Sequence, residues 1–160
     1  MKGKYMNIEL IELTFDDYNG YKYKPFEWCC EKLKDNPLID LTDGYTDYEC
    51  LDTCENVVPS VTIQQTEILR DWEDEWEEHT YYKLDYCPFC GEAINVNIVA
   101  KEDVTEPYLK FQKERSEVWR KYCRTDSKRK SEELSKTVRE LDTKINYFHN
   151  LEKYKNIEEI

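Results

Sequence analysis

The Cys87-Pro88-Phe89-Cys90-Gly91 segment carries the most specific chemical pattern in the chain. Two cysteines separated by two residues in a tight turn can direct both thiolates at one metal ion, at the ~2.3 Å distance typical of zinc. Pro88 restricts the backbone, and Gly91 permits the turn that brings backbone amides toward the sulfurs. A redox dithiol would need a helix after its first cysteine, whereas the residues that follow Cys90 favour a strand. The segment therefore predicts half of a closed, structural zinc site.

A tetrahedral site needs two further ligands, and spacing alone leaves several candidates open. The candidates are Cys29, Cys30, Cys50, Cys54, His79, Cys123 and His149. Cys50 and Cys54 have a spacing that zinc sites use, whereas the adjacent Cys29 and Cys30 are closer than usual because neighbouring side chains normally diverge. We expect Cys123 to be a small buried residue and both histidines to be ordinary structural residues rather than catalytic ones.

A Cys-Cys-Glu-Lys-Leu element at residues 29–33, followed later by Cys-Pro-Phe-Cys-Gly, resembles small zinc-ribbon proteins of phages and prophages of low-GC Gram-positive bacteria. The resemblance covers roughly residues 25–98 and implies that the two elements meet at one metal ion. It assigns Cys29, Cys30, Cys87 and Cys90 as ligands of Zn²⁺. Cys50 and Cys54 are additions to the family pattern, and either one remains an alternative to Cys29 or Cys30.

The charge of the chain changes sign near residue 101. Residues 1–100 hold 8 Lys/Arg against 22 Asp/Glu, a net charge of −14, whereas residues 101–160 hold 15 against 13, a net charge of +2. The acidic part repels nucleic acid phosphates at long range and attracts basic surfaces. The sequence shows neither a secretory signal nor a long apolar segment, so we expect a cytoplasmic protein of the bacterial host with no membrane contact.

The elements predicted on either side of this change differ in kind. The β-formers of residues 6–15 and 21–24 predict strands around an Asn19-Gly20 turn, and residues 94–99 alternate as a strand does. Beyond residue 106 the apolar residues follow a heptad-like spacing: Leu134, Val138, Leu141, Ile145 and Phe148. We therefore predict an α+β fold, with an acidic zinc-ribbon-like β module at 1–100 and a helical hairpin or coiled coil at 101–160.

The connection within the helical part leaves two arrangements open. Residues 125–127, Thr-Asp-Ser, offer N-caps and favour two antiparallel helices, whereas an unbroken pattern would give one long helix. The apolar seam of these helices can pack on the β module or on a second copy of the chain in a homodimer.

Residues 71–78 contain six carboxylates and two tryptophans. One interpretation is a solvated segment whose tryptophans pack inward. The other is a partner-binding surface on which the carboxylates imitate a nucleic acid backbone and the rings anchor in a pocket of a basic protein. The residues of this second interpretation are Trp72, Glu73, Asp74, Glu75, Trp76, Glu77 and Glu78.

The sequence favours binding over catalysis. It lacks phosphate-cradling glycine loops and the common nucleophile and zinc-hydrolase motifs, so we do not expect an enzyme. The leading hypothesis is a phage accessory protein that binds and inhibits a nucleic-acid-binding host or defence enzyme, in the manner of an anti-CRISPR protein. The alternative is direct nucleic acid binding by residues 110–130, which hold nine Lys/Arg against three Asp/Glu. A simpler role for this basic segment is to neutralise the acidic module.

Overall fold

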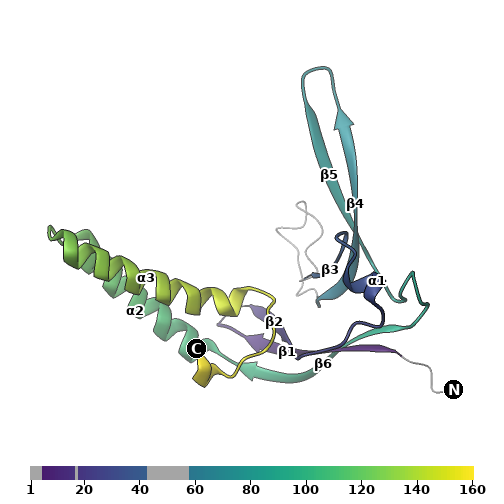
Figure 1. The fold of residues 1–160 in the computed structure, drawn as a ribbon. Helices are drawn as coiled ribbons and strands as arrows, with labels where there is room; N and C mark the ends of the chain where they lie inside the picture. Colours follow the sequence, from purple (N-terminus) through teal and green to yellow (C-terminus); the bar gives the residue numbers. More distant parts are fainter. Residues whose placement is uncertain (1–4, 17, 43–57) are drawn as a thin grey trace. The chain divides into compact units, whose positions relative to one another are not determined.

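The computed structural model describes residues 5–16, 18–42 and 58–160 of the 160-residue chain. It has the mixed α+β composition predicted from the sequence, with two small sheets and a pair of long helices (Figure 1). One sheet has the strand order β2-β1-β6 and the other has the order β3-β4-β5. Their bounds are Met6–Thr14 for β1, Asn19–Tyr23 for β2, Ile39–Thr42 for β3, Ser60–Arg70 for β4, Glu75–Lys83 for β5 and Ile94–Asp103 for β6.

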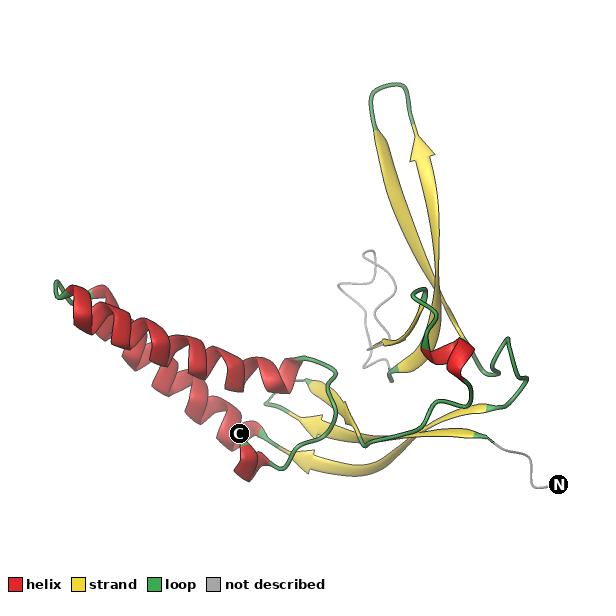
Figure 2. Cartoon of the chain, in the orientation of Figure 1, coloured by secondary structure: helices red, strands yellow, loops and turns green. Residues whose placement is uncertain are grey.

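The helices are α1 at Glu31–Lys34, α2 at Thr105–Cys123 and α3 at Lys128–His149, with a final 3-10 turn, η2, at Ile157–Glu159 (Figure 2). Within the described residues, no helix combines the length and the apolar character needed to cross a membrane. The chain divides into two compact units. The first comprises Met1–Leu10 and Lys24–Asn97, and the second comprises Ile11–Tyr23 and Ile98–Ile160.

The first sheet begins as the sequence predicts, but the turn between β1 and β2 lies earlier than expected. A hydrogen bond of 2.8 Å from the Phe15 amide to the Tyr18 carbonyl closes this connection. The predicted turn residues, Asn19 and Gly20, are instead the first residues of β2. A Cβ atom at Gly20 would lie 2.8 Å from the Phe15 ring. Gly20 therefore reflects close packing rather than the turn conformation that the sequence suggested.

The second unit has an aromatic core between the strand ends and the helices. Its buried members are Ile11, Leu13, Phe15, Val104, Tyr108, Tyr147 and Phe148. Phe15 meets the Tyr108 ring edge-on at 5.0 Å and the Phe148 ring at 6.0 Å, which is the geometry that aromatic pairs prefer. The predicted seam of α3 is thus its inward face, because Val138, Leu141 and Phe148 are all buried.

The long helices form a hairpin, as the caps in the sequence favoured. α2 ends at Cys123 and α3 begins at Lys128, so residues 124–127 connect them. Arg115 on α2 forms an ion pair with Asp142 on α3 at the helix contact. Cys123 is exposed, contrary to the prediction that it is buried. It is the last residue of α2, beside the connection at residues 124–127.

The second sheet is dominated by a long hairpin of β4 and β5, which extends well beyond β3 (Figure 1). The two strands pair antiparallel from Thr62 with Lys83 to Arg70 with Glu75. β3 pairs only with the first residues of β4, from Ser60 to Ile63. The remaining part of the hairpin is a two-stranded ribbon, and β5 is exposed along most of its length.

Lys22 is an unusual member of the second unit, since a charged residue is fully buried there. Its Nζ donates a hydrogen bond to the Asn150 carbonyl and lies 4.4 Å from the centre of the Tyr147 ring. Burial lowers the pKa of Lys22 from its ordinary value of 10.5 to about 8. Burial disfavours the charged form of an amine, and the negative charge of Glu152 offsets only part of that penalty.

The lowered pKa predicts a particular dependence of stability on pH. Between about pH 8 and 10.5 the unfolded chain keeps a proton on Lys22 that the folded chain has released, so this residue makes the free energy of unfolding rise with pH. Lys22→Met removes that contribution. Urea unfolding at several pH values should show wild type gaining stability relative to the variant across this range; parallel curves would contradict the buried, easily deprotonated Lys22.

Candidate metal centre

Four cysteine side chains converge at one point of the first unit. The Sγ atoms of Cys29, Cys30, Cys87 and Cys90 all lie within 4.8 Å of one another. Cys30 Sγ is 3.6 Å from Cys87 Sγ, and Cys29 Sγ is 3.6 Å from Cys90 Sγ. A disulfide bond is about 2.05 Å long, so these contacts are not disulfides. Four sulfurs placed tetrahedrally at ~2.3 Å from one ion would be about 3.8 Å apart, which is close to the observed separations.

Residues 87–91 form the tight turn that the sequence predicted. The Gly91 amide donates to the Cys87 carbonyl at 2.9 Å, and the Cys87 amide donates to the Glu92 carbonyl at 2.8 Å. Gly91 has a φ of 77°, a left-handed conformation that glycine adopts at little cost. Tyr86 and Ala93 then pair antiparallel on either side of the turn. The backbone thus holds Cys87 and Cys90 on one side of a closed loop.

The other two sulfurs come from adjacent residues, which the sequence argument considered too close together. Side chains of neighbouring residues point in opposite directions along a straight strand. Here the chain bends at Cys29, and Cys30 has an extended backbone, with φ −157° and ψ 156°, as it enters α1. The bend turns both side chains toward the same point. The short helix then anchors this segment, because Leu33 on α1 is fully buried.

The thiols have different acidities because their surroundings differ. Burial raises the pKa of Cys29, and hydrogen bonds to Cys90 and Cys87 raise it further. The Leu33 amide favours the Cys30 thiolate, but burial and the neighbouring thiols outweigh it, so the pKa of Cys30 is also raised. Burial opposes ionisation of Cys87 as well, yet amides of the turn, that of Cys90 first, lower its pKa to about 7. Four thiolates at this spacing need a cation to offset their mutual repulsion.

The donor set determines what such a centre can do. Four sulfur ligands fill a tetrahedral coordination shell and leave no open position for a water or a substrate. Both histidines are occupied elsewhere: His79 Nδ1 is 2.9 Å from the Thr66 hydroxyl, and His149 Nε2 is 2.9 Å from the Tyr108 hydroxyl. The cluster is therefore suited to holding the fold together rather than to hydrolysis.

Cys50 and Cys54, the alternative ligands from the sequence, lie outside the described residues. One residue beside the centre was not singled out by the sequence. Glu92 Oε2 is buried and has no hydrogen-bond partner among the residues that the structure describes. Glu92 follows Gly91 directly, but no pattern distinguishes it from the many other carboxylates of this acidic chain.

The predicted partner-binding residues lie at the end of the β4–β5 hairpin. Residues 71–74 form the connection, and Glu75, Trp76, Glu77 and Glu78 begin β5. The Asp71 carboxylate accepts hydrogen bonds from the amides of Glu73 and Asp74, which also lower the pKa of Asp71. Trp72 is 90% exposed and Trp76 is 46% exposed. The interpretation that both rings pack inward is therefore wrong for Trp72, which lies almost entirely in solvent.

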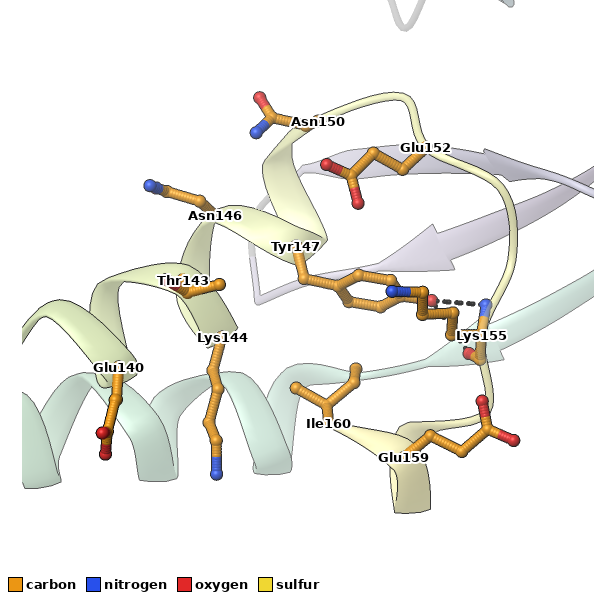
Figure 3. A pocket seen from close by; sticks show the side chains of 10 residues that line it. All are labelled: Glu140, Thr143, Lys144, Asn146, Tyr147, Asn150, Glu152, Lys155, Glu159 and Ile160. Carbon is orange, nitrogen blue, oxygen red and sulfur yellow. Dashed lines mark hydrogen bonds between the residues drawn. The ribbon is translucent and has the colours of Figure 1, made fainter.

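A separate pocket of about 570 Å³ lies at the C-terminal end of α3 (Figure 3). Its lining mixes both signs of charge, with Glu140, Glu152 and Glu159 beside Lys144 and Lys155. The Tyr147 hydroxyl at its centre donates to the Lys155 carbonyl and accepts from the Lys155 amide, each at 2.8 Å. These contacts close the C-terminal segment onto α3, and the pocket offers no converging set of groups comparable with the cysteine cluster.

Comparison with known proteins gives no assignment for this fold or this centre. No protein-family model matches the sequence, and neither the curated proteins nor the solved structures contain a significant match. The functional argument therefore depends on the geometry of the chain itself.

The cysteine cluster predicts how metal content responds to substitution. Cys30→Ser and Cys87→Ser each remove one of four converging sulfurs, so the purified protein should lose most of its bound divalent metal. Cys123→Ser is the matched control, since Cys123 is exposed on α2 and outside the cluster. Elemental analysis of protein prepared under reducing conditions measures the effect. Equal metal content in all three variants would contradict a site at these cysteines.

Proposed function

We propose that the protein is a non-enzymatic binding protein whose first unit is cross-linked by a structural zinc ion. The observation that carries the proposal is the convergence of four cysteine sulfurs within 4.8 Å of one another. Zinc is the preferred occupant because an all-thiolate tetrahedral set suits it. The cytoplasm, where we expect the protein, keeps thiols reduced and able to bind metal. Bound zinc would add directly to the folding free energy of a unit that is rich in carboxylates.

The β4–β5 hairpin supplies the surface through which such a protein would bind. We name residues 71–78 the acidic tip. Among the described residues, only one of its six carboxylates has a lysine or arginine in an ion pair, since Glu75 pairs with Arg70 at 2.7 Å. Glu77 lies 3.8 Å from His79, which is a cation only when protonated. The exposed Trp72 ring offers a large apolar area beside these charges. Exposed tryptophans at the centre of charged surfaces are frequent anchors of protein interfaces.

The charge of the acidic tip supports a partner with a basic surface. A protein channel that binds nucleic acid presents such a surface, and carboxylates spaced along an extended ribbon can occupy it in place of phosphates. The specific function we propose is therefore inhibition of a nucleic-acid-binding host or defence enzyme by occupation of its basic channel. The ribbon form suits this role, because it carries charge at its end and β5 is exposed along most of its length.

Neutralising the acidic tip tests the proposed interface. Changing Glu73, Glu75, Glu77 and Glu78 to Gln and Asp74 to Asn should reduce capture of a basic partner from bacterial lysate at least tenfold, since the charge that attracts it is removed. The control changes five exposed carboxylates of the second unit to Gln: Glu106, Glu132, Glu140, Glu158 and Glu159. Quantitative mass spectrometry of captured proteins, with and without competing DNA, gives the comparison. Undiminished capture by the neutralised tip would remove this interface.

Trp72→Ala separates binding from folding. Because the ring is 90% exposed, its removal should change the free energy of unfolding by no more than the ~0.5 kcal/mol typical of surface substitutions. Capture of the same partner should still fall severalfold if the ring is an interface anchor. A large loss of stability, or unaltered capture, would contradict this assignment.

A further inference from the structure

The end of the helical hairpin where α2 meets α3 carries a concentrated positive charge. We name six residues the basic tip: Arg120, Lys121, Arg124, Lys128, Arg129 and Lys130. Residues 120–130 contain one acidic residue, Asp126, and thus carry a net charge of +5 in a chain whose net charge is −12. Every cation of the basic tip is exposed.

The basic tip has few ion-pair partners among the residues that the structure describes. Within the described residues, Arg129 is the only one of the six in an ion pair, at 3.3 Å from Glu133, and that pair is itself well exposed. Such exposed pairs contribute little. The ion pair between the two helices joins Arg115 and Asp142, which lie farther from the α2–α3 connection than the basic tip does. Neutralisation of the acidic module at 1–100 by the basic segment, the simpler role expected from the sequence, stays a prediction.

Helix stability does not account for three of these cations. Lys128, Arg129 and Lys130 occupy the first turn of α3, which contains no acidic residue, and the Ser127 side chain makes no capping hydrogen bond there. The positive end of the helix dipole disfavours cations at this position. A sequence selected for helix stability alone would place carboxylates here, so the cations point to an anionic ligand.

An aromatic surface lies next to the basic tip on α2. The Trp119 ring is 46% exposed and stacks on the Tyr122 ring, with centroids 5.2 Å apart and an interplanar angle of 21°. Arg115 lies 5.9 Å from the centre of the Trp119 ring. An indole supported in this way and half open to solvent is suited to stacking against another flat ring. Lysine and arginine beside such a ring are the combination with which proteins hold a base and its phosphates together.

We propose that the basic tip and Trp119 bind single-stranded nucleic acid, with the cations contacting phosphates and Trp119 stacking on a base. Salt at physiological strength screens exposed charges beyond about 8 Å, so the chain's net negative charge does not by itself exclude this contact. This site is on different residues from the acidic tip. Its function does not depend on the zinc centre or on the proposed protein partner.

Charge reversal in the basic tip provides the test. Fluorescence anisotropy of a labelled single-stranded oligonucleotide of about 20 nucleotides should give a dissociation constant that rises at least tenfold in a Lys128→Glu, Arg129→Glu and Lys130→Glu variant. The matched control reverses Lys110, Lys113 and Lys136, which are exposed on the same helices away from the basic tip, and should change it less than threefold. The slope of log K against log salt concentration should also become shallower by about 2 in the tip variant. Each lost phosphate contact accounts for ~0.7 of this slope, and three cations are removed. Its first turn becomes acidic, so helix content by circular dichroism should be maintained.

Trp119→Ala distinguishes stacking from charge alone. It should weaken single-strand binding about five- to hundredfold and leave the salt slope unchanged. Wild type should bind duplex DNA more weakly than single-stranded DNA, and Trp119→Ala should not change duplex binding. Absence of binding by wild type at about 50 mM salt, or equal binding by the tip and control variants, would overturn the proposal. Self-association that only the tip variant abolishes, without oligonucleotide binding, would also overturn it and identify a second copy of the chain as the ligand.

Discussion

The convergence of four thiols is the constraint on which the first unit depends. The sulfur contacts join distant parts of the chain. Cys30 and Cys87 are separated by 57 positions, and Cys29 and Cys90 by 61. Without a cation, this arrangement places several ionisable groups where they oppose each other's ionisation. With a divalent ion it becomes a cross-link that closes a long loop and removes conformational freedom from the unfolded chain. It would add to the apolar core of the unit, which includes the buried Met6, Ile8, Leu10, Leu33 and Val61.

The β4–β5 hairpin illustrates that dependence. A two-stranded hairpin is marginally stable in water on its own, and β3 supports only the Ser60–Ile63 end of β4. Farther along, the stabilising contacts are local: the Thr66 hydroxyl meets His79 at 2.9 Å, and Arg70 pairs with Glu75 near the acidic tip. The cysteine turn follows β5 closely in sequence. A metal ion there would fix the base of the ribbon.

Much of the architecture was accessible from local sequence chemistry. The turn at residues 87–91 required glycine at a left-handed position, and the spacing of apolar residues identified the buried face of α3. The turn between β1 and β2 was misplaced because Gly20 was interpreted by its backbone freedom, whereas its lack of a side chain admits Phe15. Periodicity could not assign residues 71–78, because an even spacing of tryptophans satisfies helix and strand alike. Only strand pairing shows that Trp76 belongs to β5 and Trp72 to its connection.

The ligand set shows the same limit. Spacing favoured Cys50 and Cys54 over the adjacent Cys29 and Cys30, because it treats neighbouring side chains as diverging. The bend at Cys29 reverses that geometry, and bends arise from tertiary packing that spacing does not encode. The resemblance to zinc-ribbon proteins pointed to the set that converges, and the positions of the sulfurs now provide an independent reason to examine it. The burial of a carboxylate oxygen of Glu92, next to Gly91 in the chain, could not have been anticipated from its residue type.

X-ray absorption spectroscopy at the zinc edge tests the central claim most directly, because it measures which atoms surround the ion. Protein purified under reducing conditions should show four sulfur neighbours at ~2.3 Å and no nitrogen or oxygen ligand. A first shell containing nitrogen or oxygen, or no zinc signal in protein that is folded, would contradict the account of a closed thiolate centre at Cys29, Cys30, Cys87 and Cys90.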